Sequence, residues 1–303
     1  MKKNNKEKLN PNFVTGFTDA EGCFMLNVKH KNNLNKRYIM PIFSIQLHIR
    51  DKDLLLEIKS FFKDVGKIYI YKKAIMYRVR KLDDITNIII PHFDRFPLIS
   101  KKQSDYILFK NIVKLMEKGE HLNKEGLKKI VSLKASLNKG LSNKLKISFP
   151  DLIKIERPKT NLPIDIDYQW LAGFTSGDGC FYICICKDTG YKIGYSVKLR
   201  VSLIQHSRDE ILIKHLINIL DCGYTYKHPN ENIIRYIVTK FEDINEKIIP
   251  LFKKYKIIGE KSRDFEDFCK VAKLINNKAH ITPEGLEEIR LIKFRMNQSR
   301  YNN

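Results

Sequence analysis

Two acidic residues, Glu21 and Asp178, occupy the same place in two copies of one ten-residue phrase. The first copy, TGFTDAEGCF, covers residues 15–24, and the second, AGFTSGDGCF, covers residues 172–181. Each reads as an apolar helix that ends on an acid and a glycine and is followed at once by a strand-like run. Carboxylates without a nearby His or Cys pair favour Mg²⁺ over zinc. A single copy would be read as a simple helix stop, but the repetition favours a metal site.

Small residues in both phrases give the two helices a reason to meet. Gly16 and Ala20 are four residues apart, as are Gly173 and Gly177, so each helix carries a stripe of small residues on one face. Packing along these stripes would place the two acids side by side. Carboxylates at helix C-termini repel each other and the negative end of the helix dipole, so a divalent cation is expected there. Water activated by that cation could then attack a phosphodiester.

The repetition extends through the chain at an offset of 157–159 residues. The other matching pairs are RDKDLLLEIKSFFKDVG (50–66) with RDEILIKHLINILDCG (208–223), KKQSDYILFKNIVKLM (101–116) with EKSRDFEDFCKVAKLI (260–275), and HLNKEGLKKI (121–130) with HITPEGLEEI (280–289). We therefore predict an N-terminal half at 1–145 and a C-terminal half at 166–303. Segment 146–165 has three prolines and no helical period, as expected of a linker.

Each half is expected to run from a short helix through two strands, a helix, a second hairpin and two more helices, which is an α+β class. In 37–49 the apolar residues alternate with polar ones, and 195–206 repeats the pattern. One sheet face should therefore pack on helices while the other meets solvent or a polar partner. The second face is predicted to carry Met25, Asn27, Lys29, Tyr38, Ser44, Gln46, His48, Lys67, Tyr69, Tyr71, Met76, Arg78 and Arg80, and in the second half Tyr182, Cys184, Lys198, Arg200, Ser202, Tyr224, Tyr226, Arg235 and Thr239.

The charge of the chain favours nucleic acid as the partner of this face. Lys and Arg number 56 against 34 Asp and Glu, which gives a net charge of +22, and a polyanion would relieve the resulting repulsion. The alternative is a sheet face that only meets solvent. A membrane partner is disfavoured because no apolar run approaches the roughly 18 residues of a spanning helix. The six cysteines form no C-x-x-C pair, so reduced thiols are expected.

The phrases VTGFTDAEG (14–22) and LAGFTSGDG (171–179) resemble the two motifs of a single-chain LAGLIDADG homing endonuclease. The likeness covers nearly the whole chain, including both RD strand-to-helix junctions and both EGL helices. It is nearest to the fungal mitochondrial intron-encoded branch of that family. The resemblance implies two αββαββα halves whose antiparallel sheets form a saddle over DNA, in a chain that acts as a monomer with internal pseudo-twofold symmetry.

The resemblance also implies roles for individual residues. The eighth motif residue is the metal-binding acid, which is Glu21 in the first copy and Asp178 in the second, with the backbone carbonyls of Ala20 and Gly177 as further ligands. A basic residue and an amide surround the hydrolytic water in the family. The candidates for these roles are Lys102, Lys261 and Gln205, with Gln46 a weaker fourth.

The implied reaction is a Mg²⁺-dependent double-strand cut, with Mn²⁺ able to substitute and Ca²⁺ supporting binding without cleavage. The implied target is double-stranded DNA of roughly 20 base pairs, which would neutralise part of the +22 charge. Abundant Lys, Asn, Ile and Tyr have A/T-rich codons. Together with the absence of a transit peptide in MKKNNKEKLN, they indicate a protein encoded inside the mitochondrion.

Three positions depart from a symmetric design. The sixth motif residue is Asp19 in the first copy and Ser176 in the second, Leu47 stands where the other half has Gln205, and Asp178 is shorter than Glu21. The relative cutting of the two strands therefore stays open. So does a rival from another class, an intron-encoded RNA maturase that binds intron RNA and has no nuclease role. A catalytically dead DNA-binding relative is a third alternative, and both rivals lack a need for the two acids.

Overall fold

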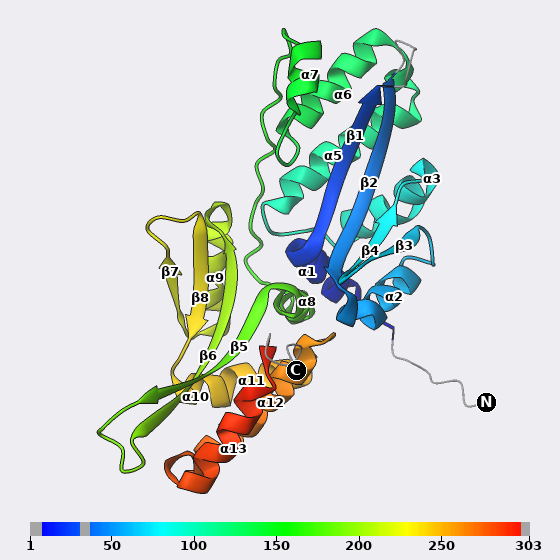
Figure 1. Cartoon of the computed structure of the whole chain (residues 1–303). Helices are drawn as coiled ribbons and strands as arrows, with labels where there is room; N and C mark the ends of the chain where they lie inside the picture. The colour runs from blue at the N-terminus through cyan, green and yellow to red at the C-terminus, as the bar shows by residue number, and fades with distance from the viewer. Residues whose placement is uncertain (1–7, 31–36, 298–303) are drawn as a thin grey trace, which may run out of the picture. The chain divides into compact units, whose positions relative to one another are not determined.

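The computed structural model describes residues 8–30 and 37–297, and the chain divides into two compact units, Met1–Pro163 and Ile164–Asn303. Each unit holds one four-stranded antiparallel sheet with helices on one side of it (Figure 1). The elements of the first unit are α1 Pro11–Glu21, β1 Gly22–His30, β2 Arg37–His48, α2 Lys52–Phe61, β3 Lys67–Tyr71, β4 Ala74–Val79, α3 Leu82–Asp84, α4 Ile90–Arg95, α5 Lys102–Glu117, α6 Lys124–Ser136 and α7 Asn143–Ser148.

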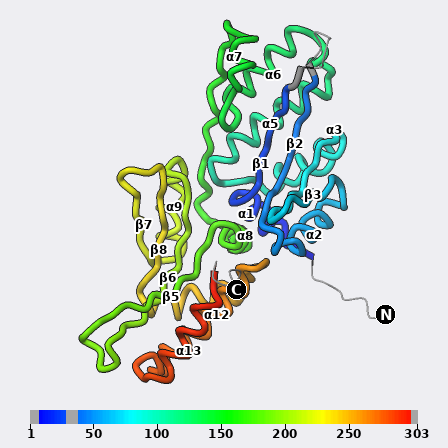
Figure 2. The backbone as a smooth tube through the Cα atoms, in the orientation of Figure 1, coloured from blue at the N-terminus to red at the C-terminus, as the bar shows by residue number. Residues whose placement is uncertain are grey.

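The second unit repeats this order as far as α13, the counterpart of α6 (Figure 2). Its elements are α8 Tyr168–Asp178, β5 Gly179–Lys187, β6 Tyr195–His206, α9 Glu210–Leu220, β7 Tyr224–Lys227, β8 Ile233–Val238, α10 Phe241–Asp243, α11 Ile249–Lys254, α12 Lys261–Asn276 and α13 Pro283–Phe294. A π-helical turn joins α3 to α4 at Ile85–Ile89 and α10 to α11 at Ile244–Ile248. The predicted α+β class with an αββαββα order in each half is confirmed.

The strand register fixes two faces on each sheet. The strand orders are β1-β2-β4-β3 and β5-β6-β8-β7. Directly opposed residues project on the same side of an antiparallel sheet. One row across the first sheet contains Cys23, Ser44, Arg78 and Lys67, and another contains Gln46, Met76 and Tyr69. The predicted residues in these rows therefore share one face of the first sheet.

The opposite face of each sheet forms the core against the helices. Phe24 and Phe43 are both fully buried, and the ring of Phe24 lies 5.4 Å from that of Phe109 on α5. In the second unit Phe181 lies 5.4 Å from Phe268 on α12. This alternation of buried and exposed positions along each strand is what fixes the register, because a slip of one residue would expose the whole apolar set.

An asparagine after the last long helix of each repeat ties that helix back to the sheet. Asn138, at φ 50°, donates its backbone N–H to Asp105 (2.8 Å) and its side-chain amide to the carbonyl of Phe24 (2.6 Å). Asn297, at φ 54°, repeats the backbone bond with Asp264 (3.0 Å). Asn tolerates the left-handed conformation better than most residues, so it can turn the chain here. Its side-chain amide meanwhile donates to a backbone carbonyl of the strand.

Residues of the proline-containing segment 146–165 pack against the first unit. Arg157 forms an ion pair with the buried Asp105 (3.0 Å) and donates to the carbonyl of Ser136 (2.6 Å). Ser104 donates to the carbonyl of Pro158 (2.8 Å). The first residues of this segment belong to α7, and from residue 149 to 163 the chain in Figure 2 has no helix or strand. Composition alone marked it as a linker and gave no sign of these contacts.

A half-buried histidine makes the first unit sensitive to acid. Burial lowers the pKa of His92 from 6.5 to about 4, and its Nε2 lies 3.1 Å from the hydroxyl of Thr15, which itself donates to the carbonyl of Phe96. Because a hydroxyl has one proton, neutral His92 must be the donor to Thr15. Leu251 stands at the matching position of the second unit, so that unit carries no counterpart of this imidazole.

Acidification should therefore loosen the first unit around His92. The folded pKa of His92 lies below its unfolded value, so the stabilisation is complete above pH 6.5 and is lost as pH falls toward 4. At pH 5 the loss amounts to about 2 kcal/mol. Hydrogen–deuterium exchange of α1 and α4 peptides at pH 5 and pH 7.5, corrected for intrinsic rates, measures it. His92→Leu should remove the pH dependence, and a variant that stays equally sensitive would contradict this explanation.

Candidate active site

The two motif helices end on their acids because a glycine follows each. Gly22 and Gly179 leave the helix at once in extended conformations, with ψ values of 157° and 154°. A Cβ on Gly22 would lie 2.4 Å from Cγ2 of Thr18, and one on Gly179 would lie 2.5 Å from the carbonyl oxygen of Thr175. Such distances are not sterically allowed, so only glycine permits the helix to pass directly into β1 or β5. Glu21 and Asp178 are therefore half-buried, each as the last residue of a helix and immediately before a strand.

The residue at the sixth motif position accepts a hydrogen bond from a distant loop in both halves, although the residue type differs. Asp19 is buried and accepts from the backbone N–H of Ile99 (2.9 Å) and from the hydroxyl of Ser100 (2.5 Å). Ser176 is also buried and accepts from the backbone N–H of Ile258 (3.1 Å). Each bond fixes the loop that leads into α5 or α12. The sequence shows the change from Asp to Ser but not this common function.

A lysine at the start of α5 and of α12 caps the motif helix. Nζ of Lys102 donates to the carbonyl oxygens of Thr18 (2.9 Å) and Ala20 (3.1 Å), and Nζ of Lys261 donates to the carbonyl of Gly177. The last carbonyls of a helix lack intrahelical partners and carry the negative end of its dipole. An ammonium group in this place offsets the unfavourable proximity of a carboxylate to that end. In the structure, each predicted lysine thus donates to the backbone carbonyl of the residue that precedes its predicted acid.

The surroundings of the two acids differ between the halves. The side-chain amide of Gln205 donates to Oδ2 of Asp178. Leu47 stands at the matching position of the first half, and its side chain cannot donate a hydrogen bond. Gln46, the weaker candidate, is exposed on the polar sheet face in the row of Met76. Gln205 has the opposite parity, so its side chain lies on the helix-covered side of β6, where α8 ends.

The oxygen atoms at each helix end fit a magnesium half-site. Among the described residues, no three or more His, Cys, Asp or Glu side chains gather as a metal-binding group. Mg²⁺ needs no such cage, because it keeps several waters and takes one or two carboxylates together with substrate phosphates. A carboxylate beside a backbone carbonyl therefore suits it. The carbonyls of Ala20 and Gly177, predicted as metal ligands, accept from Lys102 and Lys261 in this structure.

Most of the predicted contact residues are accessible on the polar faces. The exposed residues are Asn27, Tyr38, Gln46, His48, Lys67, Tyr71, Arg80, Lys198, Arg200, Tyr224, Tyr226 and Thr239, and the half-buried ones are Met25, Tyr69, Met76, Arg78, Tyr182, Cys184 and Arg235. Ser44 and Ser202 are only 4% and 6% exposed, so neither hydroxyl reaches the surface. The backbone of Lys29 belongs to β1, and its side chain lies outside the described residues.

Aromatic rings hold three of the arginines on these faces. The guanidinium groups of Arg78 and Arg80 lie 5.2 and 5.4 Å from the ring centre of Tyr69, and that of Arg200 lies 4.8 Å from Tyr182. Stacking restricts these long side chains before any ligand arrives.

None of the described helices is both long and apolar enough to cross a bilayer.

The family model described as LAGLIDADG endonuclease matches the chain twice, over residues 14–113 and 171–272. This chain belongs to the LAGLIDADG endonuclease family. The two matches begin at the two motif helices, so the family and the fold predicted from the sequence are both confirmed. A crystal structure of the LAGLIDADG homing endonuclease I-SmaMI bound to cleaved DNA shares 44% identity and superposes with a TM-score of 0.94, covering 97% of this chain and 98% of that one.

Further comparisons agree with this assignment. I-SmaMI has also been solved on an uncleaved target with calcium ions, at 44% identity and a TM-score of 0.94 over 96% of this chain and 99% of that one. "Probable intron-encoded endonuclease 2" of Neurospora crassa is 40% identical over 93% of this chain. "Probable intron-encoded DNA endonuclease 1" of Mycosarcoma maydis is 32% identical over 80% of this chain and 92% of its own length. The chain spans 64% of the length of the first of these two fungal proteins.

Proposed function

We propose that this chain is a site-specific homing endonuclease that hydrolyses both strands of a long DNA target in a metal-dependent reaction. The observation that carries the proposal is the recurrence, in each half, of a carboxylate at a helix end beside a lysine that caps the same helix. A double-strand cut requires two phosphodiesters to be hydrolysed, and a duplicated acid suits that requirement. DNA-bound structures of I-SmaMI and of I-GzeII, which is 42% identical over 96% of this chain and 99% of that one at a TM-score of 0.91, support it.

The proposed metal is Mg²⁺, held by the carboxylates of Glu21 and Asp178 and by the carbonyls next to them. When bound, it would supply charge stabilisation at the phosphate and lower the pKa of a ligated water. Lys102, Lys261 and Gln205 would orient water and phosphate oxygens beside the acids. Mn²⁺ should substitute, and Ca²⁺ should support binding without cleavage. Entry of the metal at the carbonyls of Ala20 and Gly177 requires the ammonium groups to share or release these oxygens.

The exposed polar faces are the proposed DNA surface. Arg and Lys suit guanine edges and phosphates, and Asn and Gln suit adenine. A target of roughly 20 base pairs agrees with two such faces and with the +22 charge. The internal repeat supplies both half-site surfaces from one chain, so a monomer suffices. A mitochondrial origin agrees with the relatives named as fungal intron-encoded endonucleases.

Cleavage of a randomised DNA library tests this function. The full chain should cut a discrete set of related sequences in Mg²⁺ and retain the same sequences uncut in Ca²⁺. Cutting without sequence preference would contradict a homing function. Failure to cut any DNA in Mg²⁺, together with tight binding to structured intron RNA, would favour the maturase alternative.

A further inference from the structure

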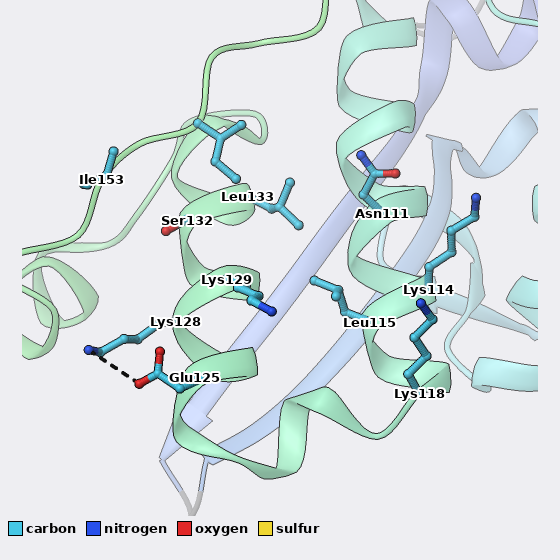
Figure 3. Close-up of a pocket in the computed structure, with 11 residues that line it drawn as sticks. Asn111, Lys114, Leu115, Lys118, Glu125, Lys128, Lys129, Ser132, Leu133 and Ile153 are labelled. Atoms are coloured by element: carbon cyan, nitrogen blue, oxygen red, sulfur yellow. Dashed lines mark ion pairs between the residues drawn. The ribbon is translucent and has the colours of Figure 1, made fainter.

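The first unit carries a lysine-lined groove on its helical layer. Its volume is about 610 Å³, and it lies between α5, α6 and the chain at residues 153–155 (Figure 3). Four of its lining residues are lysines, and they are Lys114, Lys118, Lys128 and Lys129. The sole acid of the lining is Glu125, which is 3.9 Å from Lys128. Lys129 is also paired, with Glu120 outside the lining at 3.5 Å, but exposed ion pairs neutralise little charge, so the groove remains basic.

The groove is not part of the proposed DNA surface. Helix α5 packs against the apolar face of the first sheet, where Phe109 meets Phe24 at 5.4 Å, and α6 packs against α5. The groove opens on these two helices and is thus on the other side of the sheet from the polar face. DNA bound to the polar face of the first sheet would therefore not cover the groove.

The second unit shows that the fold does not need these charges. Lys128 and Lys129 of the EGLKKI helix correspond to Glu287 and Glu288 of the EGLEEI helix. The two helices α6 and α13 occupy the same place in the repeated order of elements and have the same capping geometry, in which Asn123 or Thr282 accepts from the glycine N–H. Since a pair of glutamates is compatible with this helix, the lysine pair is not required for the helix to form.

The interior of the groove is aliphatic. Leu115 and Leu133 line it from the two helices, and Ile153 and Ile155 line it from the extended segment. Ile153 is 83% exposed and Ile155 is 40% exposed, so apolar surface faces solvent beside the lysines. No aromatic residue and no arginine is among the lining residues. Nucleic-acid surfaces typically use those two residue types for stacking and phosphate recognition.

We propose that this groove binds an acidic amphipathic helix of a partner protein. The apolar stripe of such a helix would cover Leu115 and Ile153, and its flanking carboxylates would meet Lys114, Lys128 and Lys129. The lining residues at α5 run from Asn111 to Lys118, which at about 1.5 Å per residue gives a groove wall of about 12 Å and contact with about two turns of a bound helix. The proposal does not depend on DNA cleavage, because the residues concerned belong to neither the acids nor the polar faces.

A designed peptide provides the test. A fluorescent 16-residue helix with leucines at i, i+3, i+4 and i+7 and glutamates on the flanks is titrated with the full chain, and anisotropy is recorded. Lys128→Glu with Lys129→Glu should weaken binding at least tenfold, and Ile153→Ser should weaken it as well. The double change introduces the residues that the second unit carries at these positions. The matched control is Lys144→Glu with Lys146→Glu on α7, which changes the net charge equally and should leave peptide affinity within about threefold.

Three outcomes would overturn the proposal. A scrambled peptide of the same composition that binds as well would show that only charge is sensed. Equal weakening by the α7 control would show the same. A single-stranded RNA of equal charge that displaces the peptide, and loses its own affinity in the Lys128/Lys129 variant, would assign the groove to nucleic acid. Thermal unfolding of each variant verifies that a loss of binding is not a loss of fold.

Discussion

Replacing either motif acid by its amide should stop DNA cleavage while leaving DNA binding intact. Glu21→Gln and Asp178→Asn preserve size and remove one negative charge, so each removes a metal ligand without opening a cavity. Charge stabilisation by a bound metal contributes several kcal/mol to such a reaction, and about 4 kcal/mol corresponds to a loss of about 10³-fold in rate. Single-turnover cleavage of an end-labelled target in Mg²⁺ gives this rate for each strand.

Binding of the same variants separates catalysis from structure. In Ca²⁺ the dissociation constants of both variants should stay within a few-fold of the parent. Glu231→Gln, which neutralises an exposed acid in the loop before β8, is the control and should cleave normally. A variant that loses binding or thermal stability together with cleavage would show that the acid is structural.

The second large effect concerns salt. Seven of the proposed contact residues are basic, and they are Lys29, Lys67, Arg78, Arg80, Lys198, Arg200 and Arg235. If each neutralises one phosphate, the slope of log K against log salt approaches about −6. Affinity should then fall by at least about 10³-fold between 50 and 200 mM salt. Fluorescence anisotropy of a labelled target in Ca²⁺ measures the slope.

Single substitutions measure how much each residue contributes to this slope. Arg200→Ala should reduce its magnitude by about one, since one phosphate contact is lost, and should also release Tyr182 from its stacked partner. Lys144→Ala with Lys146→Ala, on the exposed side of α7, removes charge away from the polar faces and should leave the slope unchanged. A slope near zero, or an equal change in the α7 variant, would contradict the assignment of the polar faces to DNA.

The alternation of residue types was enough to predict the sheets and their faces. It was not enough to predict how deeply each side chain is buried. Period-two spacing places Ser44 and Ser202 on the polar face, and the strand register agrees. Their burial depends on neighbours from other strands, such as Arg78 beside Ser44, and no local pattern reports it. The same limit applies to segment 146–165, whose prolines indicate a linker while its Arg157 reaches a buried Asp105.

The site shows a similar division. Glu21 and Asp178 are predicted because their phrases repeat, and Lys102, Lys261 and Gln205 are predicted from the family resemblance. The role of Asp19 and Ser176 was missed, since each bonds a backbone N–H about 80 residues away. A signal was nevertheless present in the sequence. Both copies keep a polar residue at a position that the helical period places among buried neighbours, and a buried polar group calls for a partner.

The central claim is that the carboxylates at the ends of the two motif helices hold the catalytic metal. Anomalous diffraction from crystals of the chain on an uncleaved DNA target with Mn²⁺ tests it directly. The claim predicts anomalous peaks within about 2.2 Å of the carboxylate oxygens of Glu21 and Asp178, and the loss of these peaks in the variants Glu21→Gln and Asp178→Asn. Peaks at other acids, or unchanged peaks in both variants, would contradict it.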